Sequence, residues 1–230
     1  MSSISAVVFD LDDTLIAERQ YVESGYGHIA DVLSCRIDVD SKTIYTVLCD
    51  LFASSAKNVF NRLYDKLGIP YTKEDIMGLV AAYRNHMPDI QFYDDVLPLL
   101  ETLKSMNIKT GIISDGYIQG QRNKLKALNA DRLFDDIIVT EELGREYWKP
   151  HPRAFEVMRE RLNVRFEEMI YVGDNPRKDF FIGSIYPIRT VRVCRDGVYE
   201  GVEYLDGVKE TYTVNSLAEI PALLNAAKGE

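Results

Sequence analysis

The chain has 230 residues, of which 46% are hydrophobic and 27% are charged, and this is the composition of a folded globular protein rather than a disordered or fibrous one. Its 36 acidic residues outnumber its 27 lysines and arginines, and the resulting net charge of −9 argues against a dominant nucleic-acid-binding surface. The three cysteines lack Cys-x-x-Cys spacing, and neither a basic targeting region nor an apolar run of membrane-spanning length is present, so we expect a cytoplasmic protein.

The first predicted element is a short buried strand. Residues 6–9 are apolar, and the run stops abruptly at Asp10-Leu11-Asp12-Asp13-Thr14, as expected where a buried parallel strand delivers polar residues at its C-terminal end. From about residue 18 to about residue 89, hydrophobic residues instead recur with the 3.6-residue period of helices. We predict no strand in that stretch and therefore expect an inserted helical module.

After residue 90, strands and helices alternate along the chain. We predict strands over 109–113, 136–139, 169–172 and 190–194, and helices over 96–106, 121–128 and 152–161, with a last helix from Ser216. Residues 195–211 contain three glycines and are expected to form a hairpin or a loop. The alternation predicts an α/β protein with a Rossmann-like, doubly wound parallel sheet, in which 1–17 and 90–230 form the core domain and 18–89 the helical domain.

Polar residues of the types used in phosphoryl transfer follow several of these strands. They are Asp10, Asp12 and Thr14 after the first strand, Ser114 and Asp115 after the second, Lys149 in a loop between strands, and Asp174, Asn175 and Asp179 after the fourth. In a parallel sheet the carboxyl ends of the strands share one edge, where ligands bind. Each residue alone has a plainer explanation as a solvated loop residue, a helix cap, a surface lysine or a turn. Together they supply a nucleophile, an acid and base, an ammonium group and oxygen ligands suited to Mg²⁺.

The order and strand context of these residues resemble the haloacid dehalogenase-like (HAD) hydrolase superfamily. Its four motifs match Asp10-Leu11-Asp12-Asp13-Thr14, Ser114, Lys149 and Gly173-Asp174-Asn175 with Asp179. The resemblance covers residues 6–192 and implies that the helical insertion is a C1-type cap. The motif residues around Ser114 and Lys149 resemble those of the sialic-acid-phosphatase-like and pyrimidine-nucleotidase-like branches. In this superfamily an acid two residues after the nucleophile is typical of phosphatases and phosphomutases and absent from dehalogenases, so Asp12 argues against dehalogenation.

The resemblance implies a role for each matched residue. Asp10 would attack phosphorus to form an aspartyl-phosphate, while Asp12 would protonate the leaving alkoxide and then activate water. Mg²⁺ would be bound by the Asp10 carboxylate, the Asp12 main-chain carbonyl and Asp174. The expected phosphate-binding residues are Thr14, Ser114, Asp115 and Lys149, and the expected supporting residues are Asn175 and Asp179, of which Asp179 would orient Lys149 or a water on the metal.

Substrate choice is expected to depend on the helical module and on loops beside the site. The loop before Lys149 holds Tyr147 and Trp148, and Trp148 is the only tryptophan of the chain. These two aromatic side chains are candidates for stacking against a sugar ring or a base, and packing inside the protein is an equally good explanation for them.

The function favoured by the sequence is a Mg²⁺-dependent phosphatase that acts on a small phosphorylated metabolite, either a sugar phosphate or a nucleoside monophosphate. A phosphomutase of the same superfamily is the alternative, because it shares Asp10 and Asp12 but retains the phosphoryl group. A non-catalytic ligand-binding protein is a third possibility, against which the complete set of motif residues argues. We expect neither a nucleic acid nor a membrane as a partner, and either a monomer or a homodimer.

Overall fold

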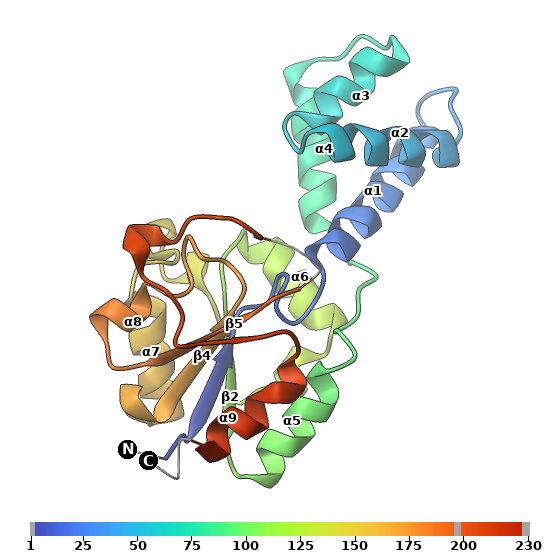
Figure 1. Ribbon diagram of the computed structural model, residues 1–230. Coiled ribbons are helices and arrows are strands. Elements are labelled where there is room, and N and C mark those ends of the chain that lie inside the picture. The colour runs from blue at the N-terminus through green and yellow to red at the C-terminus, as the bar shows by residue number, and fades with distance from the viewer. Residues whose placement is uncertain (1–2, 196–198, 227–230) are drawn as a thin grey trace. The chain divides into compact units, whose positions relative to one another are not determined.

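The chain divides into two compact units. The structure, a computed structural model, describes residues 3–195 and 199–226. One unit combines Met1–Glu18 with Gln91–Glu230, and the other is Arg19–Ile90 (Figure 1). Each unit contains its own cluster of buried apolar side chains, as expected of segments that fold as separate domains. In the described residues no helix is both long enough and apolar enough to cross a membrane.

A six-stranded sheet organises the first unit, and all of its pairings are parallel. The strands are β1 (Ala6–Phe9), β2 (Lys109–Ser114), β3 (Asp136–Val139), β4 (Met169–Gly173), β5 (Arg189–Val193) and β6 (Tyr212–Val214), in the spatial order β3-β2-β1-β4-β5-β6. The strand order reverses beside β1, which is the position where ligands bind in open α/β sheets. The predicted α/β, doubly wound fold is confirmed.

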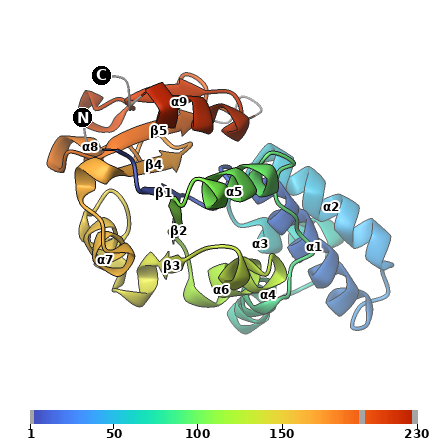
Figure 2. The same ribbon diagram turned by 90° about the horizontal axis from the view of Figure 1, so that it is seen from below.

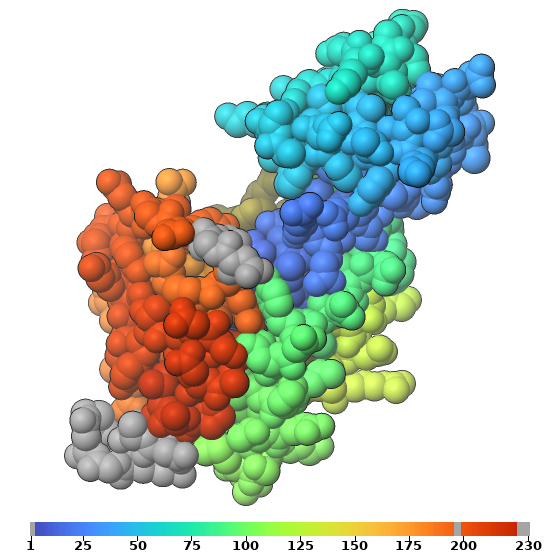
Figure 3. Space-filling model, turned by 45° about the vertical axis from the view of Figure 1, so that its right-hand side comes forward, coloured from blue at the N-terminus to red at the C-terminus, as the bar shows by residue number. Residues whose placement is uncertain are grey.

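Helices cover both faces of this sheet (Figure 2). On one face lie α5 (Val96–Ser105), α6 (Ile118–Ala127) and α9 (Ile220–Ala226), and on the other lie α7 (Arg153–Leu162) and α8 (Ile182–Ile185). The red surface of α9 lies directly beside the green surface of α5 (Figure 3). Phe155 and Met158 of α7 pack with Tyr171 of β4 in the apolar cluster under the second face, and all three side chains are fully buried.

The segment after β5 forms a loop, which is one of the two alternatives predicted for residues 195–211, and then adds a strand. Residues 196–198 lie outside the described part of the chain. From residue 199 the chain forms a loop that includes a short 3-10 turn, Leu205–Gly207, and then enters β6. This strand pairs parallel to β5, so the segment is a loop rather than a hairpin. The sixth strand was not predicted because it has only three residues, and of these only Val214 is buried. Such a short edge strand has no readable hydrophobic alternation.

The second unit is helical. It comprises α1 (Glu18–Ser34), which begins at the last residue of the first unit, with α2 (Ser41–Ser54), α3 (Val59–Leu67) and α4 (Lys73–Asn85). Local signals set the ends of these helices: Asp40 accepts a hydrogen bond from the Thr43 N–H at the start of α2, and Thr72 and Asp75 form a capping box at the start of α4. Buried side chains of all four helices, including Leu48 of α2, form the core of this unit.

Candidate active site

Asp10 is the first residue after β1 and lies almost completely buried, with 2% of its surface exposed. Its backbone N–H donates to the Val172 carbonyl at 2.8 Å, which fixes it against β4. Burial alone would raise the pKa of Asp10, but the ammonium groups of Lys149 and Lys178 outweigh burial and hold this pKa below its ordinary value. The structure therefore presents Asp10 as an ionised carboxylate at the centre of the sheet edge, as a nucleophile requires.

Lys149 lies in the loop before α7 and its side chain is entirely buried. Its Nζ atom lies 2.9 Å from Asp10 Oδ1 and 2.8 Å from Asp179 Oδ1, and it donates to the Tyr171 hydroxyl at 2.7 Å. Burial lowers the pKa of Lys149, but the carboxylates of Asp10 and Asp179 raise it well above the ordinary range, so the ammonium stays charged. The structure thus brings Lys149 and Asp179 together. From the sequence, Asp179 was expected to orient either Lys149 or a water on the metal.

Three buried carboxylates form a corner suited to a divalent cation. Oxygen atoms of Asp10, Asp174 and Asp179 lie within 4.8 Å of one another. Burial, together with the charges of Asp179 and Asp10, raises the pKa of Asp174 to about 9, and Thr14 donates to its Oδ1 atom at 3.3 Å. Among the described residues, Asp10 Oδ2 has no hydrogen-bond partner. Hard oxygen ligands and unbalanced negative charge are what a Mg²⁺-type ion binds, so the residues present fit such an ion.

Asp12 lies beside this corner but its carboxylate faces α6. Lys124 Nζ lies 2.6 Å from Asp12 Oδ1, and Gln121 Nε2 donates to Asp12 Oδ2 at 2.9 Å. Both α6 side chains are buried, with 3% and 4% exposed. The carboxylate of Asp12 is therefore absent from the cluster of oxygen atoms around Asp174, and the expectation that its main-chain carbonyl binds the metal stays a prediction. Gln121 and Lys124 were not identified from the sequence, although their spacing of three places them on one helix face.

The expected phosphate-binding residues mostly contact protein groups. Gln121 Nε2 donates to Ser114 Oγ at 2.5 Å, which ties the end of β2 to Asp12 through one amide group. Asp115 Oδ1 accepts from the Thr140 hydroxyl at 2.7 Å and from the Lys149 N–H at 3.1 Å. The Asp115 side chain therefore anchors the Lys149 loop, and any phosphate contact of Asp115 must come from its backbone.

Lys178 is a second lysine at Asp10 that sequence reasoning missed. It precedes Asp179 in the loop after β4, and its Nζ atom lies 3.6 Å from Asp10 Oδ2 and 3.7 Å from Asp115 Oδ2. Burial lowers the pKa of Lys178, but Asp10 and other nearby carboxylates raise it well above its ordinary value. Its position next to Asp179 was the available signal, since neighbouring residues of a tight loop stay at the same sheet edge.

Tyr147 and Trp148 pack against neighbouring side chains. The Tyr147 ring lies edge-on to His151 with centroids 4.9 Å apart. The Trp148 ring lies edge-on to Tyr117 at 6.5 Å, and the guanidinium of Arg145 lies over both of these rings at 5.6 and 5.1 Å. These contacts agree with a packing role, while a role of the two aromatics in substrate selection stays a prediction.

A partly buried ion pair supports the loop that carries Thr14. Both terminal nitrogens of the Arg195 guanidinium lie 2.9 Å from oxygens of Asp95, and one of them also donates to the Thr14 carbonyl at 3.0 Å. Asp95 in turn accepts from the Ser216 hydroxyl at 2.7 Å and the Leu217 N–H at 2.9 Å. The loop after β1 is thereby tied to the starts of α5 and of the C-terminal segment.

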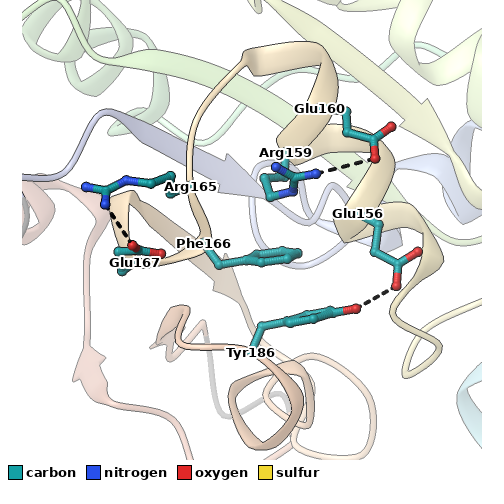
Figure 4. A pocket seen from close by; sticks show the side chains of 7 residues that line it. All are labelled: Glu156, Arg159, Glu160, Arg165, Phe166, Glu167 and Tyr186. Carbon is teal, nitrogen blue, oxygen red and sulfur yellow. Dashed lines mark hydrogen bonds and ion pairs between the residues drawn. The ribbon is translucent and has the colours of Figure 1, made fainter.

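A surface pocket of about 450 Å³ lies at the opposite end of the strands, beside the N-terminal end of β4. Its seven lining residues are drawn in Figure 4: Glu156, Arg159, Glu160, Arg165, Phe166, Glu167 and Tyr186. The charged side chains pair with one another or, for Glu156, with the Tyr186 hydroxyl at 2.6 Å, and Phe166 stacks on Tyr186 at 4.0 Å. This pocket is separate from the carboxylate cluster, which lies where β4 ends.

Similarity to known proteins identifies the family of this chain. A family profile described as haloacid dehalogenase-like hydrolase matches residues 7–193. This chain belongs to the haloacid dehalogenase-like hydrolases. It is similar to two glyceraldehyde 3-phosphate phosphatases: 28% identical to that of Methanocaldococcus jannaschii over 98% of this chain and 99% of the relative, and 30% identical to that of Methanopyrus kandleri over 87% and 88%. A HAD phosphatase structure from Thermococcus onnurineus has a TM-score of 0.61 at 24% identity and covers 96% of this chain and 98% of that chain.

These relatives confirm the predicted HAD family and the predicted enzyme class, a phosphoric-monoester hydrolase. In HAD terms, the first motif lies at the end of β1, the second at the end of β2 and the fourth after β4, with Lys149 of the third motif between Asp10 and Asp179. The resemblance to the C1-capped sialic-acid-phosphatase-like and pyrimidine-nucleotidase-like branches stays a prediction.

Proposed function

We propose that this HAD hydrolase is a Mg²⁺-dependent phosphatase that removes the phosphoryl group from a small phosphorylated metabolite through an aspartyl-phosphate on Asp10. The observation that carries the proposal is the buried contact of Asp10 with Lys149, at 2.9 Å, beside the carboxylates of Asp174 and Asp179. An ionised nucleophile, an ammonium and a cation-binding corner in one buried place are what attack on a phosphate dianion requires, because uncompensated negative charges would repel each other.

The proposed reaction has two steps, and both use groups at the strand ends. In the first, an oxygen of Asp10 bonds to phosphorus while the bond from phosphorus to the leaving oxygen breaks, and Asp12 gives that oxygen a proton. In the second, water gives a proton to Asp12 and bonds to phosphorus, and the bond to Asp10 breaks. Lys124 and Gln121, which contact separate oxygens of Asp12, hold its carboxylate in one orientation for both transfers.

Mg²⁺ at Asp10 and Asp174 would supply charge neutralisation for the transferring phosphoryl group. Asp179 contributes in a different way, since its two oxygens are occupied by the Lys149 ammonium at 2.8 Å and by the Asn175 N–H at 2.9 Å. It therefore holds Lys149 against Asp10 and fixes the turn after β4.

We propose small phosphorylated carbohydrates as the first substrate class, and triose phosphates among them, because the relatives compared above are named glyceraldehyde 3-phosphate phosphatases. Other sugar phosphates and nucleoside monophosphates complete the class predicted from the motifs. We also propose that the helical unit, residues 19–90, is the cap that selects among them, and that the protein works in the cytoplasm.

The test is phosphate release from a panel of triose phosphates, hexose phosphates and nucleoside monophosphates, with Mg²⁺ or with EDTA. Asp10→Asn is compared with Asp94→Asn, because Asp94 is an exposed aspartate of the same unit. The proposal expects release that requires Mg²⁺, is abolished by Asp10→Asn and is unchanged by Asp94→Asn, with both variants folded by circular dichroism. Release that persists in EDTA or in Asp10→Asn would contradict it.

A further inference from the structure

The two lysines at Asp10 differ in what their ammonium groups contact. An ammonium has three N–H donors. Those of Lys149 are matched by three close oxygens, on Asp10, Asp179 and Tyr171, at 2.9, 2.8 and 2.7 Å, in a fully buried setting. Lys149 therefore balances the charge of the carboxylates, and in this arrangement its donors are already used by the protein.

Lys178 has its donors available. Its Nζ atom lies 3.6 and 3.7 Å from single oxygens of Asp10 and Asp115, beyond hydrogen-bond distance, and among the described residues its side chain makes these ion pairs but no hydrogen bond. Its side chain is 26% exposed, whereas those of Asp10 and Asp115 are 2% and 8% exposed. It is thus a cation that lies against the nucleophile and is also open to an incoming group.

The backbone of the loop after β4 fixes the origin of this side chain. The Asn175 carbonyl accepts from the N–H groups of Lys178 and Asp179 at 3.2 and 3.0 Å. The Asn175 N–H donates to Asp179 Oδ2 at 2.9 Å, and the Asn175 side chain accepts from the Arg177 N–H at 3.0 Å. Arg177 is exposed, so the turn directs one of two consecutive cations toward Asp10 and leaves the other in solvent.

The oxygen of Asp10 that faces Lys178 is the one with unused lone pairs. Oδ1 contacts Lys149, whereas Oδ2 is buried without a hydrogen-bond partner among the described residues and forms an ion pair with Lys178 at 3.6 Å. A phosphoryl group that reaches Oδ2 must therefore come next to the Lys178 ammonium. Charge-assisted hydrogen bonds from lysine to phosphate oxygens are among the stronger polar contacts in proteins.

We propose that Lys178 is a phosphate-binding residue of this site, whose ammonium binds an oxygen of the transferring phosphoryl group at Asp10 while Lys149 balances the buried carboxylates. The proposal rests on the phosphatase function proposed above. It also separates the effect on phosphate from the effect on metal. A cation near Asp10 Oδ2 attracts a phosphate and repels a divalent ion, so removing it should weaken phosphate binding without weakening Mg²⁺ binding.

The experiment is calorimetric titration of the full-length protein, first with Mg²⁺ and then, in excess Mg²⁺, with inorganic phosphate. Lys178→Met removes the charge, Lys178→Arg keeps it, and Arg177→Met is the matched control because it removes a charge one residue earlier in the same loop. We expect Lys178→Met to weaken phosphate binding by about 10-fold to 100-fold while Mg²⁺ binds as tightly as before or more tightly. Lys178→Arg should recover most of the phosphate affinity, and Arg177→Met should match the wild type in both titrations.

Two results overturn the proposal. One is a folded Lys178→Met that binds phosphate as tightly as Arg177→Met, and the other is loss of phosphate and Mg²⁺ affinity together, which is what a purely structural lysine would give. If Lys178→Met does not fold, Lys178→Gln is titrated and judged in the same way. The assay with the substrate panel distinguishes failure of the proposed function from failure of the Lys178 proposal. If the wild type releases no phosphate from any substrate, the proposed function is wrong. If the wild type is active and Lys178→Met is equally active, only the proposed role of Lys178 is wrong.

Discussion

Adding one methyl group at Gly173 tests whether Asp179 must hold Lys149 in place. Gly173 is the last residue of β4, and a Cβ atom there would lie 2.7, 2.8 and 2.9 Å from Oδ2, Cγ and Cβ of Asp179. These distances are shorter than real contacts allow, so in Gly173→Ala the Asp179 side chain must move by roughly 0.5 Å or more. No charge is added or removed, so any loss of activity comes from position alone.

The magnitude follows from the contacts of Asp179. Its Oδ1 atom lies 2.8 Å from Lys149 Nζ, and its Oδ2 atom accepts from the Asn175 N–H at 2.9 Å, so a shift of this size lengthens or breaks both bonds. Overpacking of a filled site costs about 1–3 kcal/mol of stability. Displacement of a catalytic group by up to about 1 Å costs up to about 100-fold in rate, so we expect kcat for Gly173→Ala to fall about 10-fold to 100-fold.

Gly183→Ala is the control for this prediction. Gly183 lies in α8, and its Cβ atom would have no neighbour closer than 3.7 Å, so alanine fits there without displacing any group. The assay is phosphate release at saturating substrate and Mg²⁺, with the urea midpoint of each variant measured in parallel. Equal activity of Gly173→Ala and Gly183→Ala would refute the reasoning that the exact placement of Asp179 matters for the reaction.

Three further predictions concern the groups around the site. Asp95→Asn should lower the free energy of unfolding by about 2–3 kcal/mol relative to Asp94→Asn, because it leaves the partly buried Arg195 guanidinium without its carboxylate. Burial raises the pKa of Asp95, but hydrogen bonds from Arg195, Ser216 and Leu217 outweigh it and lower this pKa, so its stabilising contribution is present above the unfolded carboxyl pKa and is lost as pH falls through the folded value. The difference between the two variants in urea unfolding should therefore shrink on acidification, and a constant difference would contradict this assignment. Lys124→Met should lower kcat by about 10-fold or more, because Asp12 loses its 2.6 Å ion pair. Lys126→Met, at an exposed position of the same helix, should leave kcat unchanged. Equal kcat values for the two variants would show that Lys124 does not position Asp12. Mg²⁺ at about 100 times its dissociation constant should stabilise the wild type by about 2.7 kcal/mol and Asp174→Asn by much less, as measured by thermal melting, and equal stabilisation would place the ion elsewhere.

The sequence was sufficient to predict five of the six strands, and to group the motif residues at the ends of these strands, for a single physical reason. In an all-parallel sheet every strand delivers its C-terminal residues to the same edge, so Asp10, Ser114 and Asp174 could be grouped without knowing any side-chain contact. The helices of residues 19–90 could also be predicted, because apolar residues in this segment recur with the helical period over four helices.

The contacts between side chains were not predictable in the same way. Gln121 and Lys124 meet Asp12 across separations of 109 and 112 residues, and nothing local to α6 indicates which of its polar side chains faces the site. Lys178 reads as one of two consecutive basic residues, and only the folded turn shows that it, rather than Arg177, lies against Asp10. Asp179 was assigned a supporting role, and its place in the carboxylate cluster depends on that same turn.

The most direct test of the central claim is to look for the phosphoryl group on Asp10 itself. Enzyme mixed with ³²P-labelled substrate and Mg²⁺ is quenched in acid within milliseconds, digested and mapped, for the wild type, Asp10→Asn and Asp12→Asn. We predict an acid-stable, hydroxylamine-labile label on the peptide that contains Asp10. It should be absent in Asp10→Asn and longer-lived in Asp12→Asn, because activation of water is impaired. Phosphate release by an enzyme that never carries this label, together with activity that survives Asp10→Asn, would contradict it.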